Sequence, residues 1–250
     1  MPSYFEAVKD LLFPPHCLGC QRRLPSSRPP LFCADCSRSV DVLSPPWCPC
    51  CGLPFSHGAD HLCGDCLQQT FSFHRARSLC AYQPPVSSLI LALKFAQNQT
   101  GLASLRALVE QASFSGYFSE PDMLLPVPLH PSRLRQRGFN QALAIAQTCF
   151  PQWWQRNTSG ILIRHHNTPP QSLLTGAKRR MNLNQAFEVR APLVIKDKNV
   201  LLVDDVLTTG STVNACAKVL LAAGARRIEV FTVARSLVRE GLSPDFRKQD

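Results

Sequence analysis

The chain has 250 residues, of which 45% are apolar, enough to fill the core of one large or two small domains. Its formal net charge of +10 is uneven, because residues 1–80 hold 7 basic and 6 acidic side chains whereas residues 81–250 hold 20 and 11. No apolar run is long enough for a membrane span and the first residues lack a signal-peptide pattern, so we expect a cytoplasmic protein without a membrane span. Any polyanion would bind the basic part after residue 80.

Residues 1–13 have the apolar spacing of a short amphipathic helix that packs against the rest of the protein. Cysteine then dominates, with nine of the twelve cysteines in the first 66 residues. In a reducing compartment this density indicates metal binding rather than disulfides. Residues 1–70 are therefore expected to form an N-terminal helix and a metal-binding module.

Eight of these cysteines form four Cys-x-x-Cys pairs. Each pair directs two thiolates at one ion, and two pairs complete a tetrahedral shell with no open position, which predicts two structural zinc ions. The metals would stabilise a segment that has few large apolar residues. Sequential ribbons are favoured over a cross-braced arrangement, although both satisfy the spacing, and Cys50 has no assigned role. The predicted ligands are Cys17, Cys20, Cys33, Cys36, Cys48, Cys51, Cys63 and Cys66.

Residues 71–120 are expected to be a linker and a helical lead-in. The pattern indicates a strand at 78–82 and helices at 87–95 and 101–109. Lys94, near the end of the first of these helices, is a candidate contact for phosphate or DNA.

Residues 121–240 alternate strands and helices, as in an α/β domain. A buried strand that begins at 122 ends in a proline-punctuated loop, and a helix at 139–149 follows. Three arginines precede that helix, and guanidinium groups bind phosphate in a bidentate way, so a pyrophosphate or phosphodiester site is expected there. A solvated charge cluster is the alternative interpretation. The arginines are Arg133, Arg135 and Arg137.

A short strand at 161–163 precedes a polar, basic and turn-rich segment at 164–181. Such a segment suits a mobile loop over a phosphate-rich site, and an ordinary surface loop has a similar composition. Arg179 within it is a further candidate for phosphate or DNA contact. Residues 241–250 are expected to be a polar tail.

The segment Val200–Thr212 carries the strongest functional signal. An apolar, β-prone run leads into Asp204 and Asp205, and then into small hydroxylated residues around Gly210 before a helix at 213–221. A strand that delivers a loop to a helix N-terminus offers backbone N–H groups and a positive dipole end to a phosphate. The carboxylates can accept hydrogen bonds from vicinal sugar hydroxyls or hold a divalent cation.

This order of strand, acidic pair and loop predicts a site for a phosphorylated ribose. A solvated acidic strand end followed by an ordinary helix cap is the alternative. The thirteen residues resemble the phosphoribosyl-pyrophosphate motif of type I phosphoribosyltransferases. The predicted phosphoribosyl-binding residues are Asp204, Asp205, Thr208, Thr209, Gly210, Ser211 and Thr212.

Several ordered blocks together resemble the ComF family and, in layout, its GntX-type DNA utilization proteins of Gram-negative bacteria. The resemblance covers residues 15–236. Its blocks, besides the cysteine pairs and the acidic motif, are Leu93-Lys94-Phe95, Pro126-Val127-Pro128-Leu129, Arg133 with Arg137-Gly138-Phe139-Asn140-Gln141, Thr168-Pro169 with Gln171, Arg179 with Asn182, and Ala186-Phe187.

The resemblance implies an α/β fold, namely a type I phosphoribosyltransferase-like parallel sheet with a small N-terminal zinc-ribbon module. It implies a role in using incoming DNA, in natural transformation or as a nutrient, and for some members contact with single-stranded DNA. No catalytic reaction comes with the resemblance, so whether the protein is an enzyme stays open.

Three functions follow for testing. The first is a DNA-handling protein that binds single-stranded DNA and a phosphoribosyl or nucleotide phosphate. The second is an active phosphoribosyltransferase that uses phosphoribosyl pyrophosphate and Mg²⁺, although the sequence shows no distinctive acceptor pocket. The third is an adaptor whose zinc module docks a DNA-uptake helicase or a recombination mediator.

Overall fold

The computed structural model describes residues 14–25, 29–95, 100–165 and 186–237. The helix expected at 1–13, most of the loop expected at 164–181 with its candidate Arg179, and the tail expected at 241–250 lie outside the described residues. Within the described part of the chain, no helix combines the length and the apolar character that crossing a membrane requires.

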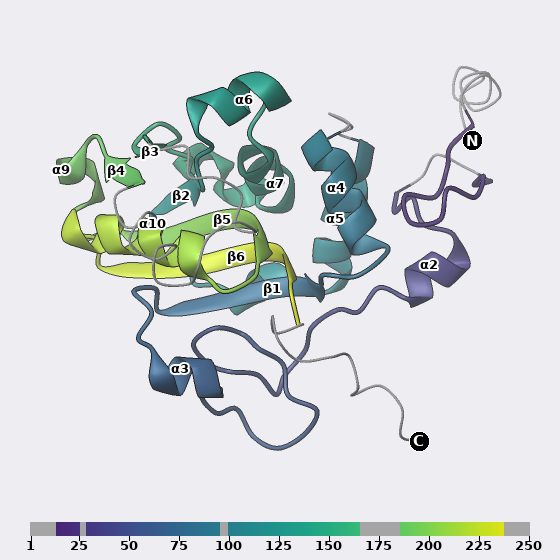
Figure 1. The fold of residues 1–250 in the computed structure, drawn as a ribbon, viewed down its shortest axis with the longest axis horizontal. Helices are drawn as coiled ribbons and strands as arrows, with labels where there is room; N and C mark the ends of the chain where they lie inside the picture. The colour runs from purple at the N-terminus through teal and green to yellow at the C-terminus, as the bar shows by residue number, and fades with distance from the viewer. Residues whose placement is uncertain (1–13, 26–28, 96–99, 166–185, 238–250) are drawn as a thin grey trace.

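Four parallel strands in the order β1-β6-β5-β2 form the main sheet (Figure 1). The central pair is joined along its whole length, from Asn199 opposite Arg227 to Leu207 opposite Arg235. The strands are β1 (Arg75–Ala81), β2 (Met123–Pro126), β5 (Asn199–Leu207) and β6 (Arg227–Arg235). The segment expected as a linker and lead-in thus contributes β1, one of the two edge strands of this sheet.

Helices surround the sheet and a small antiparallel pair of strands, β3 and β4, lies beside it. The larger helices are α4 (Val86–Phe95), α5 (Thr100–Gln111), α6 (Pro131–Arg137), α7 (Gln141–Cys149) and α10 (Ser211–Ala222). The shorter elements are α2 (Ala34–Arg38), α3 (Gly64–Gln68), α9 (Pro192–Ile195), the 3₁₀ helices η1 (Phe114–Tyr117) and η2 (Pro151–Arg156), and the strands β3 (Leu162–Arg164) and β4 (Phe187–Val189).

The apolar run of β5 explains the two-layered core. Successive side chains of a strand point to opposite faces, and both faces of this sheet are covered. Leu201 and Val203 join the core formed with α4, α5 and α7. Val200 and Leu202 join the core formed with α10 and the β3–β4 pair. A continuous apolar strand of this kind is what a parallel sheet buried on both faces requires.

The eight Cys-x-x-Cys cysteines form two groups in sequence order, the first ribbon (residues 17–36) and the second ribbon (residues 48–66). The first ribbon packs on the α4 and α5 side, where Cys17 and Phe32 enter the core and the Leu31 N–H donates to Ser104 Oγ at 2.8 Å. The second ribbon lies beside β1 (Figure 1).

The outer edge of β1 is covered by the chain that connects and enters the ribbons. The Leu43 N–H donates to the Leu79 carbonyl, and the Ala81 N–H donates to the Asp41 carbonyl, each at 2.9 Å. Further along, the Ala76 N–H donates to the Cys50 carbonyl at 2.7 Å. These bonds satisfy a strand edge that would otherwise be open to pairing with another chain.

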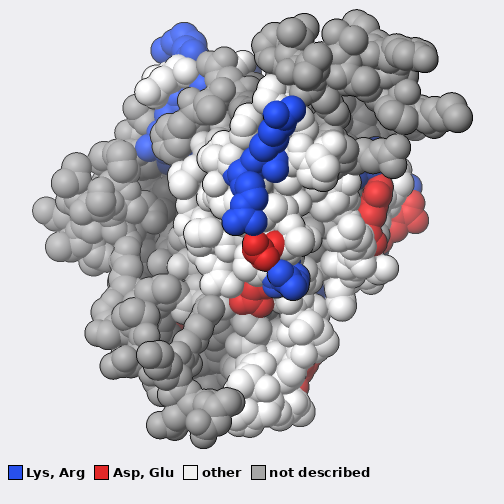
Figure 2. Space-filling model, turned by 90° about the vertical axis from the view of Figure 1, so that its right-hand side faces the viewer, with Lys and Arg blue, Asp and Glu red and all other residues white. Residues whose placement is uncertain are grey.

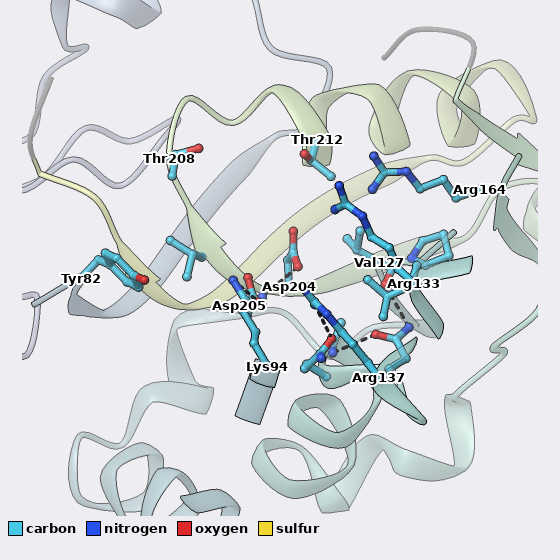
Figure 3. A pocket seen from close by; sticks show the side chains of 16 residues that line it. Tyr82, Lys94, Val127, Arg133, Arg137, Arg164, Asp204, Asp205, Thr208 and Thr212 are labelled. Carbon is cyan, nitrogen blue, oxygen red and sulfur yellow. Dashed lines mark hydrogen bonds and ion pairs between the residues drawn. The ribbon is translucent and has the colours of Figure 1, made fainter. Parts of the chain in front are cut away.

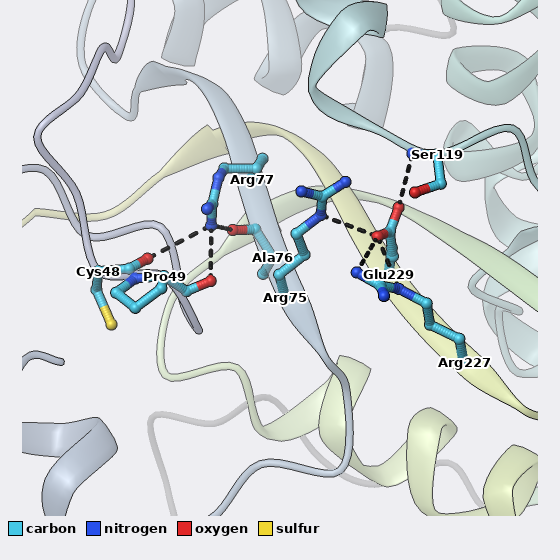
Figure 4. A network of polar contacts seen from close by, with 8 residues as sticks. All are labelled: Cys48, Pro49, Arg75, Ala76, Arg77, Ser119, Arg227 and Glu229. Carbon is cyan, nitrogen blue, oxygen red and sulfur yellow. Dashed lines mark hydrogen bonds and ion pairs between the residues drawn. The ribbon is translucent and has the colours of Figure 1, made fainter. Parts of the chain in front are cut away.

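Two buried arginines fasten the second ribbon to the sheet, and each is only 7% exposed. Arg77 of β1 donates to the carbonyls of Cys48 and Pro49 (Figure 4). It also lies over the Trp47 ring. Arg235 of β6 donates to the Cys51 carbonyl at 2.7 Å and to its sulfur at 3.4 Å.

Near the amino end of β6, beside Arg75 of β1, Glu229 is 4% exposed. It pairs with Arg75 at 2.9 Å and with Arg227 at 3.0 Å, and it accepts from the Ser119 N–H (Figure 4). This buried carboxylate ties β1 and β6 to the segment that leads into β2.

Candidate functional site

A cavity of about 300 Å³ lies at the carboxyl edge of the sheet, where β5 leads into α10 (Figure 3). The loops that follow parallel strands meet at this edge, which is where ligands bind in open α/β folds. The residues that line the cavity are Tyr82, Lys94, Val127, Pro128, Leu129, Arg133, Arg137, Asn140, Gln141, Ala142, Arg164, Asp204, Asp205, Val206, Thr208 and Thr212.

The acidic pair of β5 lies in this cavity. The Asp205 N–H donates to Asp204 Oδ1 at 2.9 Å, and Lys94 Nζ lies 2.9 Å from Asp205 Oδ2. Burial and the neighbouring Asp205 carboxylate raise the pKa of Asp204 to about 7. The pair is therefore a poorly solvated acidic group for which a cation or hydroxyl donors are favourable partners.

The loop after the acidic pair ends at Gly210, which has a φ of +75° and forms the N-cap of α10. A Cβ at this position would lie 3.1 Å from Phe71 Cε1, so the loop needs glycine for its backbone conformation and for close packing. Because Gly210 has no side chain to cap the first turn of α10, that helix end suits an anion. Thr208 and Thr212 line the cavity, whereas Thr209 and Ser211 bond to each other at 2.8 Å outside it.

Of the three arginines that were predicted to form a phosphate site, only two face the cavity. They lie on the helix α6, which was not predicted, and the helical repeat places Arg133 and Arg137 on the cavity side. Arg135, between them, is exposed and does not line the cavity. Arg137 also donates to Gln141 Oε1 at 3.2 Å, which joins α6 to the start of α7.

Sequence reasoning missed Arg164 at the end of β3. Its guanidinium lies 5.3 Å from the centre of the Phe187 ring and reaches the same cavity (Figure 3). Burial lowers the pKa of Arg164, and the nearby Arg133 adds to this effect. A basic residue at the end of a short buried strand was the available signal, but only the fold brings β3 to α6.

Gln141 is a second group that the sequence did not single out as a site residue, although it belongs to the blocks of the resemblance. It is 2% exposed and lines the cavity, and its Nε2 has no hydrogen-bond partner among the described residues. A buried donor without a partner is costly, so an acceptor atom from a ligand or a water molecule would be favourable at this wall.

A second cavity of about 280 Å³ adjoins the first and shares Pro128, Leu129, Asn140 and Arg164 with it. Its other walls are largely apolar side chains from α6 and β3, with two polar ones at the rim. They are Pro131, Leu134, Gly160, Leu162, Ile163, His165 and Arg190.

The sulfur atoms of each ribbon lie within 4.8 Å of one another, which suits a single tetrahedral ion. Burial and the neighbouring thiols raise the pKa of Cys36 and of Cys66, so a cation would favour the thiolate form of these two side chains. The first cysteine of each ribbon favours the thiolate. Burial alone would raise the pKa of Cys17 and Cys48, but backbone N–H donors lower these values to about 6 and about 7.

Comparison with known proteins gives two matching families. Residues 8–67 match the family described as "Double zinc ribbon domain", and residues 160–245 match the family described as "Phosphoribosyl transferase domain". The first match and the two cysteine groups together support two structural zinc ions.

Similar proteins cover most of the chain. The DNA utilization protein YhgH of Escherichia coli O6:H1 is 35% identical over 82% of this chain and 91% of its own length. Competence protein F of Haemophilus influenzae is 35% identical over 88% of this chain and 96% of its own length. Competence protein ComFC of Bacillus subtilis is 29% identical over 82% of this chain and 84% of its own length.

Proposed function

Since the chain belongs to the ComF family, whose members are named DNA utilization and competence proteins, we propose that it handles imported DNA while binding a phosphoribosyl ligand. The supporting observation is the content of the cavity at the end of β5. Two carboxylates, two threonine hydroxyls and four basic side chains line one space of about 300 Å³. A sugar that carries phosphate offers a partner for each of these groups.

In this proposal the ligand is phosphoribosyl pyrophosphate or a nucleotide. Asp204 and Asp205 accept hydrogen bonds from the ribose hydroxyls, and the loop from Thr208 to Thr212 binds the 5-phosphate at the start of α10. Arg133 and Arg137 bind further phosphate groups. Mg²⁺ would be held by the carboxylates together with the ligand's phosphates, because hard oxygen ligands suit this ion.

Single-stranded DNA is proposed to bind the basic surface around the cavity rather than to enter it. Figure 2 shows basic side chains in a row that ends beside acidic side chains on one face of the molecule. Arg135 of α6 is exposed and lies outside the cavity, so it is available to a DNA phosphate. A DNA backbone lacks vicinal hydroxyls that could donate hydrogen bonds to the acidic pair. Its negative phosphates would therefore be repelled by the two carboxylates without compensation.

Calorimetry with phosphoribosyl pyrophosphate and Mg²⁺ tests the ligand. We expect heat of binding from the wild type and none from the double variant Asp204→Asn, Asp205→Asn. Glu110→Gln, an exposed carboxylate on α5, serves as the control for charge alone. A wild-type protein that gives no heat would refute the phosphoribosyl part of the proposal.

Fluorescence anisotropy with a labelled single strand tests the DNA part. Affinity should fall steeply as salt rises, because phosphate contacts release counterions. Arg135→Gln should weaken DNA binding without changing the binding of phosphoribosyl pyrophosphate, since Arg135 lies outside the cavity. DNA binding that is absent, or that does not depend on salt, would count against this part.

A second candidate function is phosphoribosyl transfer, and the second cavity favours it. This apolar space shares a wall with the first cavity, so a flat ring bound there would lie next to the ribose. In that reaction the acceptor nitrogen forms a bond to the anomeric carbon while pyrophosphate leaves. Release of pyrophosphate from phosphoribosyl pyrophosphate, measured with a panel of nucleobases, is the test. If no nucleobase accelerates the release of pyrophosphate, the protein binds phosphoribosyl pyrophosphate without transferring the phosphoribosyl group.

A further inference from the structure

Lys94 occupies the place beside the acidic pair where a free cation would otherwise bind. Its Nζ lies 2.9 Å from Asp205 Oδ2, and the two side chains are only 21% and 16% exposed. The lysine is firmly positioned, because Leu89, Ile90 and Leu93 on the same helix are each 1% exposed. Figure 3 shows it reaching from α4 toward Asp205.

The charges around the cavity make it a site for anions. Four basic side chains line it against two carboxylates. A bare divalent cation would meet a net positive charge and would have to displace an ammonium group that is already paired. A phosphate-bearing ligand would meet attraction from the same charges. The basic residues are Lys94, Arg133, Arg137 and Arg164.

Gln141 is a further group in the cavity that favours an anionic ligand over a bare cation. Its buried Nε2 is a hydrogen-bond donor with no partner among the described residues, although it lines the cavity. A donor in that position is satisfied by an acceptor such as a phosphate oxygen and not by a cation.

We propose that Lys94 is the resident counter-cation of Asp205, and that a divalent cation binds the acidic pair only together with a phosphate-bearing ligand. The phosphates bring negative charge that exceeds the positive excess of the cavity, and they offer Lys94 an alternative partner. Asp205 is then released for the divalent cation. This inference rests on the phosphoribosyl site proposed above and adds to it the order in which its ligands bind.

Binding of Mn²⁺, as a paramagnetic substitute for Mg²⁺, tests this order in the zinc-loaded full-length chain. Electron paramagnetic resonance reports the free Mn²⁺ with and without phosphoribosyl pyrophosphate. The wild type should bind Mn²⁺ alone weakly and should bind it at least about tenfold more tightly with the ligand present. Lys94→Met should bind Mn²⁺ alone at least about tenfold more tightly than the wild type.

Matched variants locate the effect. Lys94→Arg keeps the charge and should behave like the wild type with Mn²⁺ alone. Lys218→Met removes an exposed lysine of α10 and should change nothing. Adding Asp205→Asn to Lys94→Met should abolish the gained affinity. If Lys94→Met fails to fold, as judged by zinc content and circular dichroism, Lys94→Gln replaces it.

Two results would overturn the inference. The first is that the wild type and Lys94→Met bind Mn²⁺ alone with equal affinity. The second is that phosphoribosyl pyrophosphate binds the wild type but does not increase its affinity for Mn²⁺. Failure of the proposed function gives a different result. Phosphoribosyl pyrophosphate would then bind neither protein with or without Mn²⁺, while the comparison with Mn²⁺ alone still decides the role of Lys94.

Discussion

Asp204, a residue of the proposed phosphoribosyl site, is expected to lower the stability of the folded protein near neutral pH. Its carboxyl group is partly buried and lies beside Asp205, and both effects disfavour its charge. The folded-state pKa of about 7 lies above the unfolded value of about 3.9. The folded protein thus keeps a proton that the unfolded chain releases, so stability falls as pH rises from about 4 to about 7 and is level above that.

This linkage predicts the behaviour of Asp204→Asn. The amide cannot ionise, so the variant should escape the penalty, and its advantage over the wild type should grow by about 1 kcal/mol between pH 6 and pH 8. Urea unfolding of both proteins at the two pH values measures the difference and cancels the groups that they share. An advantage that stays constant with pH would show that Asp204 is ionised throughout this range.

Gly210→Ala should weaken both stability and ligand binding. The positive φ costs about 1 kcal/mol for a residue with a Cβ, and the contact with Phe71 adds to it. Gly58→Ala is the matched control, because Gly58 also has a positive φ but open space around it. Thermal unfolding and calorimetry with phosphoribosyl pyrophosphate should show a larger loss for Gly210→Ala, and ligand affinity unchanged for Gly58→Ala.

At the residue scale, the sequence predicts groups that are close together along the chain. Asp204, Asp205 and Gly210 follow one another in a motif, so their chemistry can be inferred locally. Arg164 enters the cavity from β3, and Lys94 meets Asp205 from α4. Those contacts depend on the packing of separate elements, and no local pattern encodes them.

Strand β1 connects the main sheet to the second ribbon. It pairs with β6 on one side, receives the ribbon connection on the other, and carries Arg77 into the second ribbon. Arg77 is 7% exposed, and this burial lowers its pKa. Its three carbonyl acceptors and the Trp47 ring take the place of water.

Arg77→Met should destabilise the protein by about 2–4 kcal/mol, because it leaves buried carbonyl groups without a donor. Arg38→Met is the control, since Arg38 is 76% exposed in its ion pair with Asp35 and should change stability little. Urea unfolding measures both variants. Equal effects of the two substitutions would mean that the buried hydrogen bonds contribute little.

At the element scale, β5 and α10 are predictable because β5 has a run of four apolar residues before its aspartates and α10 has a clear apolar period. The strand predicted at 78–82 is found at Arg75–Ala81, where two arginines obscure the apolar pattern. Both are partnered by residues distant in sequence, Arg75 by Glu229 and Arg77 by the second ribbon. Helix α6 was missed because its arginines and its short length resemble a loop.

In the whole molecule, the two ribbons are attached differently. The first ribbon adds apolar side chains to the α4 and α5 core. The second ribbon receives the buried guanidinium groups of Arg77 and Arg235. A zinc ion with four thiolates carries a net charge of −2, which offsets these two positive charges.

Loss of the second zinc should therefore harm the sheet more than loss of the first. Cys48→Ser and Cys17→Ser should each retain about one zinc ion per chain instead of two, measured by elemental analysis. The unfolding temperature should fall further for Cys48→Ser, since buried arginines lose their counter-charge. Equal falls would show that the guanidinium groups are satisfied by the carbonyls alone.

The module and the fold class could be predicted from the sequence, because cysteine spacing and the acidic motif are both local. The sequential grouping of the cysteines was favoured but left open, and the structure groups them in that order. The packing of the second ribbon against β1 and β6 was not predicted from the sequence. Contacts such as that from Arg235 to Cys51 span 184 residues and leave no periodic signal.

The covered edge of β1 also bears on the order of protein synthesis. Ser78 of β1 meets its neighbour Thr232 of β6 across 154 residues, so β1 leaves the ribosome long before its partner strand exists. The segment that precedes β1, however, is already available and bonds to its outer edge. The chain before β1 can thus cover one edge of this strand while β6, which pairs with its other edge, has yet to be synthesised.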